Sequence, residues 1–300
     1  MKLQYSAEVS AARRTLKPLV ALESSVLAQG LPYPHNVEAA ERCEAAVREE
    51  GAVPATMAVI DGELWAGLQA AQIDRLAKGK GLMKVGSRDL AIAVARRATG
   101  GTTVSATCEL AAAAGIHVFA TGGLGGVHRG VEEHMDISQD LPAIARFPVA
   151  VVCAGAKSVL DLPRTMELLE TLAVPVIGVG TDELPGFYSR ETGLHLEHRV
   201  ANAAEAGAVM RARGELGQGG MIFAVPPPKA TALKRADVEK HLKAALAAAK
   251  KRKVAGKAVT PFLLGEMARR TKGQALQANL ALLENNARFA AKLAVAMGWR

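Results

Sequence analysis

Residues 149–158 read VAVVCAGAKS, an apolar run from Val149 to Ala154 that passes directly into a short turn carrying Lys157. A short apolar run of this kind predicts a buried strand. Working outward, we expect a strand at Ile116 to Ala120, a helix at Asp140 to Arg146, a helix at Leu160 to Leu172 and a strand at Val174 to Val179. Such alternation favours a layered sheet with helices on its faces. We therefore expect one α/β domain over residues 1–300, an α/β/α sandwich with a mostly parallel central sheet and a helical C-terminal part.

The flanking sequence extends this pattern in both directions. Expected strands are Leu19 to Leu22, Val53 to Ile60 and Glu63 to Ala66, the last two joined by a tight Asp61-Gly62 turn. Expected helices are Val37 to Glu50 capped by Asn36 and closed by Gly51, Ser87 to Ala98 capped by Ser87, Ala106 to Ala114 stopped by Gly115, and the Ala/Leu-rich Leu276 to Met297.

Composition excludes several classes of protein. Half of the 300 residues are hydrophobic, but no apolar run approaches the roughly 20 residues of a membrane-spanning helix. Met1 to Ser10 is polar and lacks the features of a secretory signal, so we expect a short tail on a cytoplasmic protein. Three widely spaced cysteines, Cys43, Cys108 and Cys153, argue against disulfides or a zinc site and fit small core residues.

The net charge of +8 is concentrated in one segment. Lys229 to Lys257 holds ten Lys or Arg and two acidic residues, so the rest of the chain is neutral. From Ala236 the segment predicts a helix with Val238, Leu242 and Leu246 on one stripe and lysines elsewhere. Without interleaved aromatic residues for base stacking, a solvated helix face is favoured. An RNA-binding module using this helix is the alternative, and it would show strongly salt-dependent affinity.

Ligands of open α/β sheets gather beyond the carboxyl ends of the strands, which makes the polar residues after apolar runs the first candidates. Four segments qualify: Glu23-Ser24-Ser25, the loop TGGLGGVHRG at 121–130, Gly155-Ala156-Lys157-Ser158 and Thr181-Asp182. The glycine loop fails the dinucleotide pattern, since His128 stands where a third glycine is required. The segment ending in Lys157 also fails the P-loop pattern, because it lacks the upstream glycine and Ala156 precedes the lysine.

Lys157 is not expected for packing at the end of an apolar strand. Partial burial or a neighbouring cation would free its amine to attack a carbonyl carbon. A surface lysine that begins the next loop is the alternative.

Seven motifs together carry a resemblance that covers about Pro18 to Ala291. They are ALESS (21–25), GAVPAT (51–56), GGTTV (100–104), FATGGLGGVHRG (119–130), AGAKS (154–158), VTPFLL (259–264) and NNA (285–287). In this order they resemble the pseudouridine-5'-phosphate glycosidase family. Two departures are Ser25, where the family usually has threonine, and Gly186, where alanine is more usual.

The resemblance implies an enzyme that reversibly cleaves the carbon–carbon glycosidic bond of pseudouridine 5'-phosphate, giving uracil and ribose 5-phosphate, in pseudouridine catabolism. It implies Lys157 as the Schiff-base nucleophile, Glu23 as the proton donor and Asp136 as the ligand of Mn²⁺, or of Mg²⁺ or another divalent ion. Substrate contacts are implied for Lys84, Val104, Thr121, His128, Ser138, Asp140 and Asn285, with Thr121 and His128 at the phosphate end. It further implies a homotrimer whose partner is this small-molecule substrate. From the composition we expect neither a nucleic-acid nor a membrane partner.

Each assignment has a structural alternative. Glu23 could cap a helix or pair with a surface lysine, and Asp136 or Asp140 could cap the helix that begins at Leu141. Lys84 could be a solvated loop charge, and His128 a loop histidine bonded to backbone. Another lysine-imine lyase acting on a sugar phosphate is the rival enzyme, and identifying the product would distinguish the two.

Overall fold

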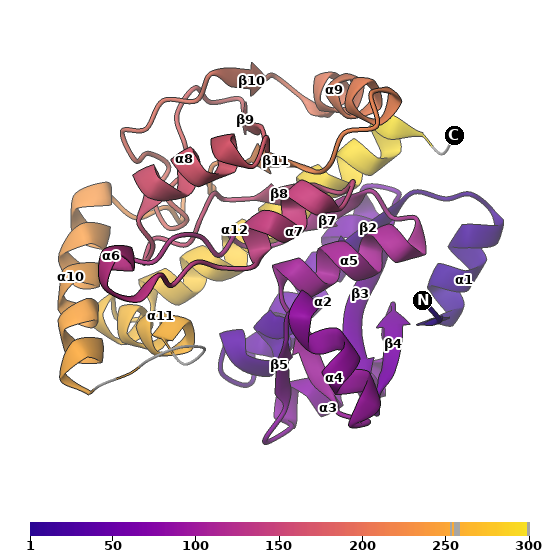
Figure 1. Cartoon of the computed structure of the whole chain (residues 1–300), viewed down its shortest axis with the longest axis horizontal. Coiled ribbons are helices and arrows are strands. Elements are labelled where there is room, and N and C mark those ends of the chain that lie inside the picture. The colour runs from indigo at the N-terminus through magenta and orange to yellow at the C-terminus, as the bar shows by residue number, and fades with distance from the viewer. Residues whose placement is uncertain (253, 255–258, 299–300) are drawn as a thin grey trace.

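The computed structural model describes residues 1–252, 254 and 259–298 as a layered α/β fold (Figure 1). Its strands are β1 (Leu3–Tyr5), β2 (Leu19–Leu22), β3 (Val53–Ile60), β4 (Glu63–Ala66), β5 (Met83–Val85), β6 (Gly100–Thr102), β7 (Val118–Ala120), β8 (Ala150–Cys153), β9 (Val176–Val179), β10 (His198–Val200) and β11 (Met221–Ala224). Its α-helices are α1 (Ala7–Arg14), α2 (His35–Glu49), α3 (Ala70–Lys78), α4 (Leu90–Ala95), α5 (Val104–Ala114), α6 (Val131–His134), α7 (Asp140–Arg146), α8 (Leu162–Thr171), α9 (Ala203–Glu215), α10 (Arg235–Lys251), α11 (Val259–Arg270) and α12 (Gln274–Met297). A π-helical turn, η1 (Val26–Gly30), and a 3₁₀ turn, η2 (Ser87–Asp89), complete the described elements.

The sheet is mostly parallel, as the sequence predicts. Its main order is β1-β4-β3-β2-β7-β8-β11-β9-β10, and every pair from β3 through β10 is parallel. Antiparallel pairing occurs where β3 meets β4 and β6. The β3–β4 turn is built by Asp61 and Gly62, whose φ angles of 52° and 81° explain the Asp-Gly pair.

Alternate residues of the central strands feed two cores, one on each face of the sheet. Val20, Val118 and Val152 join the core formed with α2, α9 and α12, whereas Phe119 and Val151 join the core formed with α5 and α7. This follows from the two-residue period of a strand, and burial on both faces explains why the strands are continuously apolar. Figure 1 shows α5 and α7 in front of the sheet and the long α12 running behind it.

Several expected elements are confirmed with small shifts at their ends. The helix that precedes Gly115 ends there, and Gly115 adopts a φ of 70° that suits a glycine C-cap. The basic helix α10 buries Val238 and Leu242 and partly buries Leu246, as its stripe predicts, while Lys253 and Lys257 of the same segment lie outside the described residues. All three cysteines are free and buried.

Two predicted helix caps are wrong. Helix α2 begins at His35, and Asn36 is buried with its amide donating to the carbonyls of Leu27 and Ala77. The Ser87 hydroxyl donates to Glu109, and the segment forms η2 and then α4, which stops at Ala95. In both cases a tertiary hydrogen bond takes the polar side chain that local sequence assigns to a cap.

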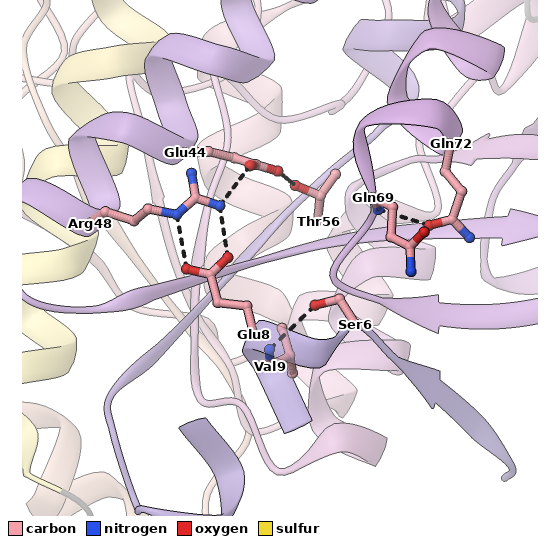
Figure 2. Close-up of polar contacts among 8 residues, drawn as sticks. All are labelled: Ser6, Glu8, Val9, Glu44, Arg48, Thr56, Gln69 and Gln72. Atoms are coloured by element: carbon pink, nitrogen blue, oxygen red, sulfur yellow. Dashed lines mark hydrogen bonds and ion pairs between the residues drawn. The ribbon is translucent and has the colours of Figure 1, made fainter. Parts of the chain in front are cut away.

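The N-terminal tail prediction is also wrong, because residues 3–14 form β1 and α1. Ser6 caps α1 by accepting from the Val9 amide at 3.3 Å (Figure 2). Arg48 of α2 donates to both oxygens of Glu8 at 2.9 and 2.8 Å and to Glu44, which also accepts from the buried Thr56 hydroxyl. This network ties α1 to α2 and β3. Figure 2 also shows the backbone N–H of Gln69 donating to the side-chain oxygen of Gln72 at the start of α3.

Candidate functional site

Three adjacent parallel strands bring the main candidates to one edge of the sheet. Glu23 follows β2, Thr121 follows β7 and Lys157 lies in the turn after β8, and the three strands are neighbours in that order. The site therefore lies where the sheet topology predicts it, at the carboxyl ends of the strands.

Hydroxyl groups hold both oxygens of the Glu23 carboxylate. Ser25 donates to Oε2 and the buried Thr121 donates to Oε1. Glu23 therefore neither caps a helix nor depends on a surface lysine for its position. Thr121 lies beside Glu23 but does not itself line either of the two cavities described below.

Buried side chains fix the glycine loop at two points. Asn286 of α12 donates to the Thr121 carbonyl at 2.8 Å beneath the start of the loop. Asp140 is 5% exposed and accepts from the Gly125 amide at 2.9 Å and, through its other oxygen, from the Ser105 amide at 3.0 Å near the start of α5. The alternative in which Asp140 caps its own helix does not hold, since Gln139 is the residue at that cap and both Asp140 oxygens accept from amides elsewhere.

Gly125 leaves no room for a side chain at the second of these points. A Cβ atom there would meet the Asp140 Oδ2 atom at 2.7 Å and would collide with the Ser138 hydroxyl. The absence of a side chain therefore lets the loop backbone approach Asp140 closely.

A cavity of about 300 Å³ opens beside Glu23 and Lys157. Most of the predicted site residues line it: Glu23, Lys84, Val104, His128, Asp136, Ser138, Asp140 and Lys157. Its wall also includes the N-terminal end of α5, at Thr103 and Val104. We refer to this space as the polar cavity.

A second, smaller cavity shares Glu23, Ser25, Lys84 and Lys157 with the first. Its remaining wall is largely apolar, formed by Val26, Phe187, Leu264 and Leu283, with glycine backbone and two amide side chains, Gln29 and Asn279. We call this space the apolar cavity. Glu23 and Lys157 thus stand at the junction of two chemically different spaces.

Asn285 is not brought to either cavity. Its amide donates to the Pro226 carbonyl at 3.4 Å, and the neighbouring Asn286 takes the structural role under the glycine loop. The amide that reaches the apolar cavity is Asn279. Asn279, Leu283 and Asn286 are spaced i, i+4 and i+7 on one face of the helix. Two polar residues on this otherwise apolar face were the feature of the sequence that could have marked Asn279 and Asn286 as candidates. Arg88 and Thr103, both in the wall of the polar cavity, were also missed.

His128 and Asp136 face each other at the rim of the polar cavity. The His128 Nδ1 atom lies 3.8 Å from an Asp136 oxygen, and the His128 amide donates to the Asp136 carbonyl. Burial lowers the pKa of His128, and the nearby Lys157 and Lys84 lower this pKa further against the opposing effect of Asp136. A neutral imidazole is therefore favoured at neutral pH.

The Asp136 side chain is 48% exposed, so it can offer carboxylate oxygens to an ion in the cavity. Among the described residues, no group of three or more His, Cys, Asp or Glu side chains is arranged to hold a metal ion. These donors fit a divalent cation of the Mg²⁺ or Mn²⁺ type only if water or substrate supplies most of its ligands.

The described residues include no helix that is both long and apolar enough to cross a membrane. This result agrees with the hydropathy pattern of the sequence.

Comparison with known proteins places this site in a family. The family model described as "Indigoidine synthase A like protein" matches residues 8–296. A protein of Myxococcus xanthus named pseudouridine-5'-phosphate glycosidase is 65% identical over 99% of this chain and 98% of its own length. One of the same name from Caldanaerobacter subterraneus is 49% identical over 98% of this chain and 96% of its own.

A solved structure has the same fold over nearly the whole chain. The crystal structure of a prealnumycin C-glycosynthase in complex with ribulose 5-phosphate matches with a TM-score of 0.90 and 38% identity, covering 98% of this chain and 96% of that one. On these full-length similarities, the chain belongs to the pseudouridine-5'-phosphate glycosidase family, within the indigoidine synthase A like proteins.

Proposed function

We propose that this protein reversibly cleaves the carbon–carbon glycosidic bond of pseudouridine 5'-phosphate to uracil and ribose 5-phosphate, as a step of pseudouridine catabolism. The names of its full-length relatives support this reaction. The observation that carries it is the position of Glu23 and Lys157 at the junction of a polar and an apolar cavity. A sugar phosphate suits the first space and a flat base suits the second.

The chemistry requires an amine and an acid at this junction. Uracil leaves through carbon, so protonating a leaving nitrogen, as for ordinary nucleosides, does not help. The ribose ring opens as its C1–O4 bond breaks, with O4 taking up a proton and uracil N1 losing one. The neutral Lys157 amine then adds to C1 and passes a proton back to N1, and its lone pair forms an iminium as the bond from C1 to C5 of uracil breaks. Glu23 gives a proton to C5, and water then hydrolyses the imine to release ribose 5-phosphate and restore the lysine.

The phosphate end of the substrate fits the polar cavity. Lys84 and Arg88 supply positive charge, and Ser138 and Thr103 supply hydroxyl groups. The N-terminal end of the eleven-residue helix α5 opens onto the same wall, and such ends favour anions. Contacts from Val104 to the substrate are part of this proposal.

We also propose that Asp136 holds a divalent ion, Mn²⁺ or Mg²⁺, whose other ligands are mostly water. A bound cation would offset negative charge near the phosphate. His128, kept neutral, is then free to donate or accept one hydrogen bond in the cavity. A homotrimer is proposed on the family resemblance alone, and sedimentation equilibrium would test it.

Trapping the imine tests the mechanism. Borohydride reduces an iminium, so incubation with ribose 5-phosphate and borohydride should attach one sugar phosphate per chain, and peptide mass spectrometry should map it to Lys157. Lys157→Ala should neither trap the sugar nor release uracil. An adduct on Lys84 would show that the nucleophile is misassigned, and an active enzyme that forms no adduct would refute the imine mechanism.

Product identification separates this function from that of another lysine-imine lyase. Incubation with pseudouridine 5'-phosphate should yield uracil and ribose 5-phosphate in equal amounts. Trapping of a sugar phosphate without uracil release from this substrate would favour the rival enzyme.

A further inference from the structure

Gln29 carries a buried amide oxygen that the fold leaves unpaired. The residue lies in the π-helical turn η1, which follows the Glu23-Ser24-Ser25 segment. Its Nε2 atom donates to the Leu82 carbonyl at 3.3 Å, and its Oε1 atom is buried with no hydrogen-bond partner among the described residues. The Leu82 carbonyl determines the assignment of the amide nitrogen and oxygen of Gln29, because exchanging them would place two oxygen atoms next to each other.

An unpaired buried acceptor is costly, and native proteins satisfy nearly all such groups. Gln29 lines the apolar cavity together with Glu23 and Lys157, so its side chain borders the space that a ligand would fill. The other amide in that wall is Asn279, which is 6% exposed. The remaining wall is mainly hydrocarbon and glycine backbone. A flat ligand with an N–H group would complement this wall, because the N–H group can donate a hydrogen bond to the unpaired acceptor.

Uracil attached through C5 has this chemistry. Its two N–H groups and the C2 carbonyl between them form the edge away from the sugar. When C5 lies between Glu23 and Lys157, this edge is left to the remaining walls of the apolar cavity. We propose that Gln29 Oε1 accepts a hydrogen bond from a ring N–H of uracil and thereby determines the specificity for this base. This inference rests on the proposed function.

Inhibition by free bases tests the assignment. We would measure Ki for uracil, 1-methyluracil and 3-methyluracil against uracil release from pseudouridine 5'-phosphate, in the parent enzyme and in Gln29→Met. The substitution keeps the approximate size of the side chain and removes the acceptor. Gln277→Met is the matched control, because Gln277 is exposed on α12 and lines neither cavity.

In the parent enzyme, at least one methylated base should bind about 5- to 150-fold more weakly than uracil, the range expected for a buried hydrogen bond that is lost without replacement. Gln29→Met should weaken uracil by a similar factor and bring the Ki values of that methylated base and uracil within about threefold of each other. The control should retain the parent values.

Three outcomes would overturn the inference. If the Ki values of all three bases for the parent enzyme lie within about threefold of one another, the enzyme does not recognise a ring N–H group. This result does not depend on the folding of any variant. If Gln29→Met keeps the parent discrimination, another residue reads the base. If the parent enzyme releases no uracil from pseudouridine 5'-phosphate, the proposed function fails and the inference falls with it.

Discussion

Replacing Asp140 by asparagine should destabilise the protein by about 2–4 kcal/mol, a large effect for an isosteric change. The two Asp140 oxygens accept from the Ser105 and Gly125 amides at 3.0 and 2.9 Å, and the residue is 5% exposed. Asparagine retains one acceptor oxygen and turns an NH₂ group toward the other amide. The variant therefore loses a charge-assisted hydrogen bond, which contributes about 1.5–3 kcal/mol, and leaves a buried N–H unpaired.

Urea unfolding, followed by circular dichroism, measures this difference from the parent protein. Asp161→Asn is the control, since Asp161 accepts from a backbone amide of Arg164 at 3.1 Å at the start of α8 but is more exposed. Asparagine is as good an N-cap as aspartate, so the control should change stability by less than about 1 kcal/mol. Equal, small effects in both variants would refute the argument that Asp140 ties the glycine loop to α5.

Three further outcomes are expected. Glu23→Gln should lower turnover by about 10²- to 10⁴-fold with little change in substrate affinity, because it removes the transferable proton, and turnover within threefold of the parent would reject Glu23 as the acid. Asp136→Ala should fold normally and lose metal-dependent activity; unchanged Mn²⁺ affinity and turnover would remove it as the ligand. The three cysteines should not react with a thiol reagent at pH 8 until the protein unfolds. Burial raises the pKa of Cys43 and of Cys153 to about 12, and it raises the pKa of Cys108 well above its usual value. Rapid labelling of the native protein would contradict their burial.

Sequence periodicity predicted β2, β3, β4, β7, β8 and β9 but missed the buried strand β11, which lies between β8 and β9 in the sheet. Apolar runs that end in a polar turn located β2 and β8, and the Asp61-Gly62 pair located the β3–β4 turn. The short strands β5 and β6 have only three residues each, too few to establish a period, and were missed. Asn36 and Ser87 were misassigned because their partners, Leu27 with Ala77 and Glu109, lie elsewhere in the chain.

The residues of the candidate site likewise fall into a group that the sequence could predict and a group that it could not. Residues that follow strands, such as Glu23 and Lys157, could be predicted because topology alone brings strand ends together. Gln29 and Asn279 could not, since their importance depends on which helix face borders a cavity. Choosing between Asn285 and Asn279 required the rotation of α12, which the motif by itself does not fix.

Helix α12 also has a consequence for the order in which the protein matures during synthesis. It packs against β2, β7 and β8, supplies Asn279 to the apolar cavity and holds the glycine loop through Asn286, yet it is translated after every strand of the sheet. Until α12 leaves the ribosome, the nascent sheet exposes the apolar face that this helix later covers. We therefore expect the emerging chain to be prone to aggregation until α12 packs, and this interval is the one in which a chaperone would matter most.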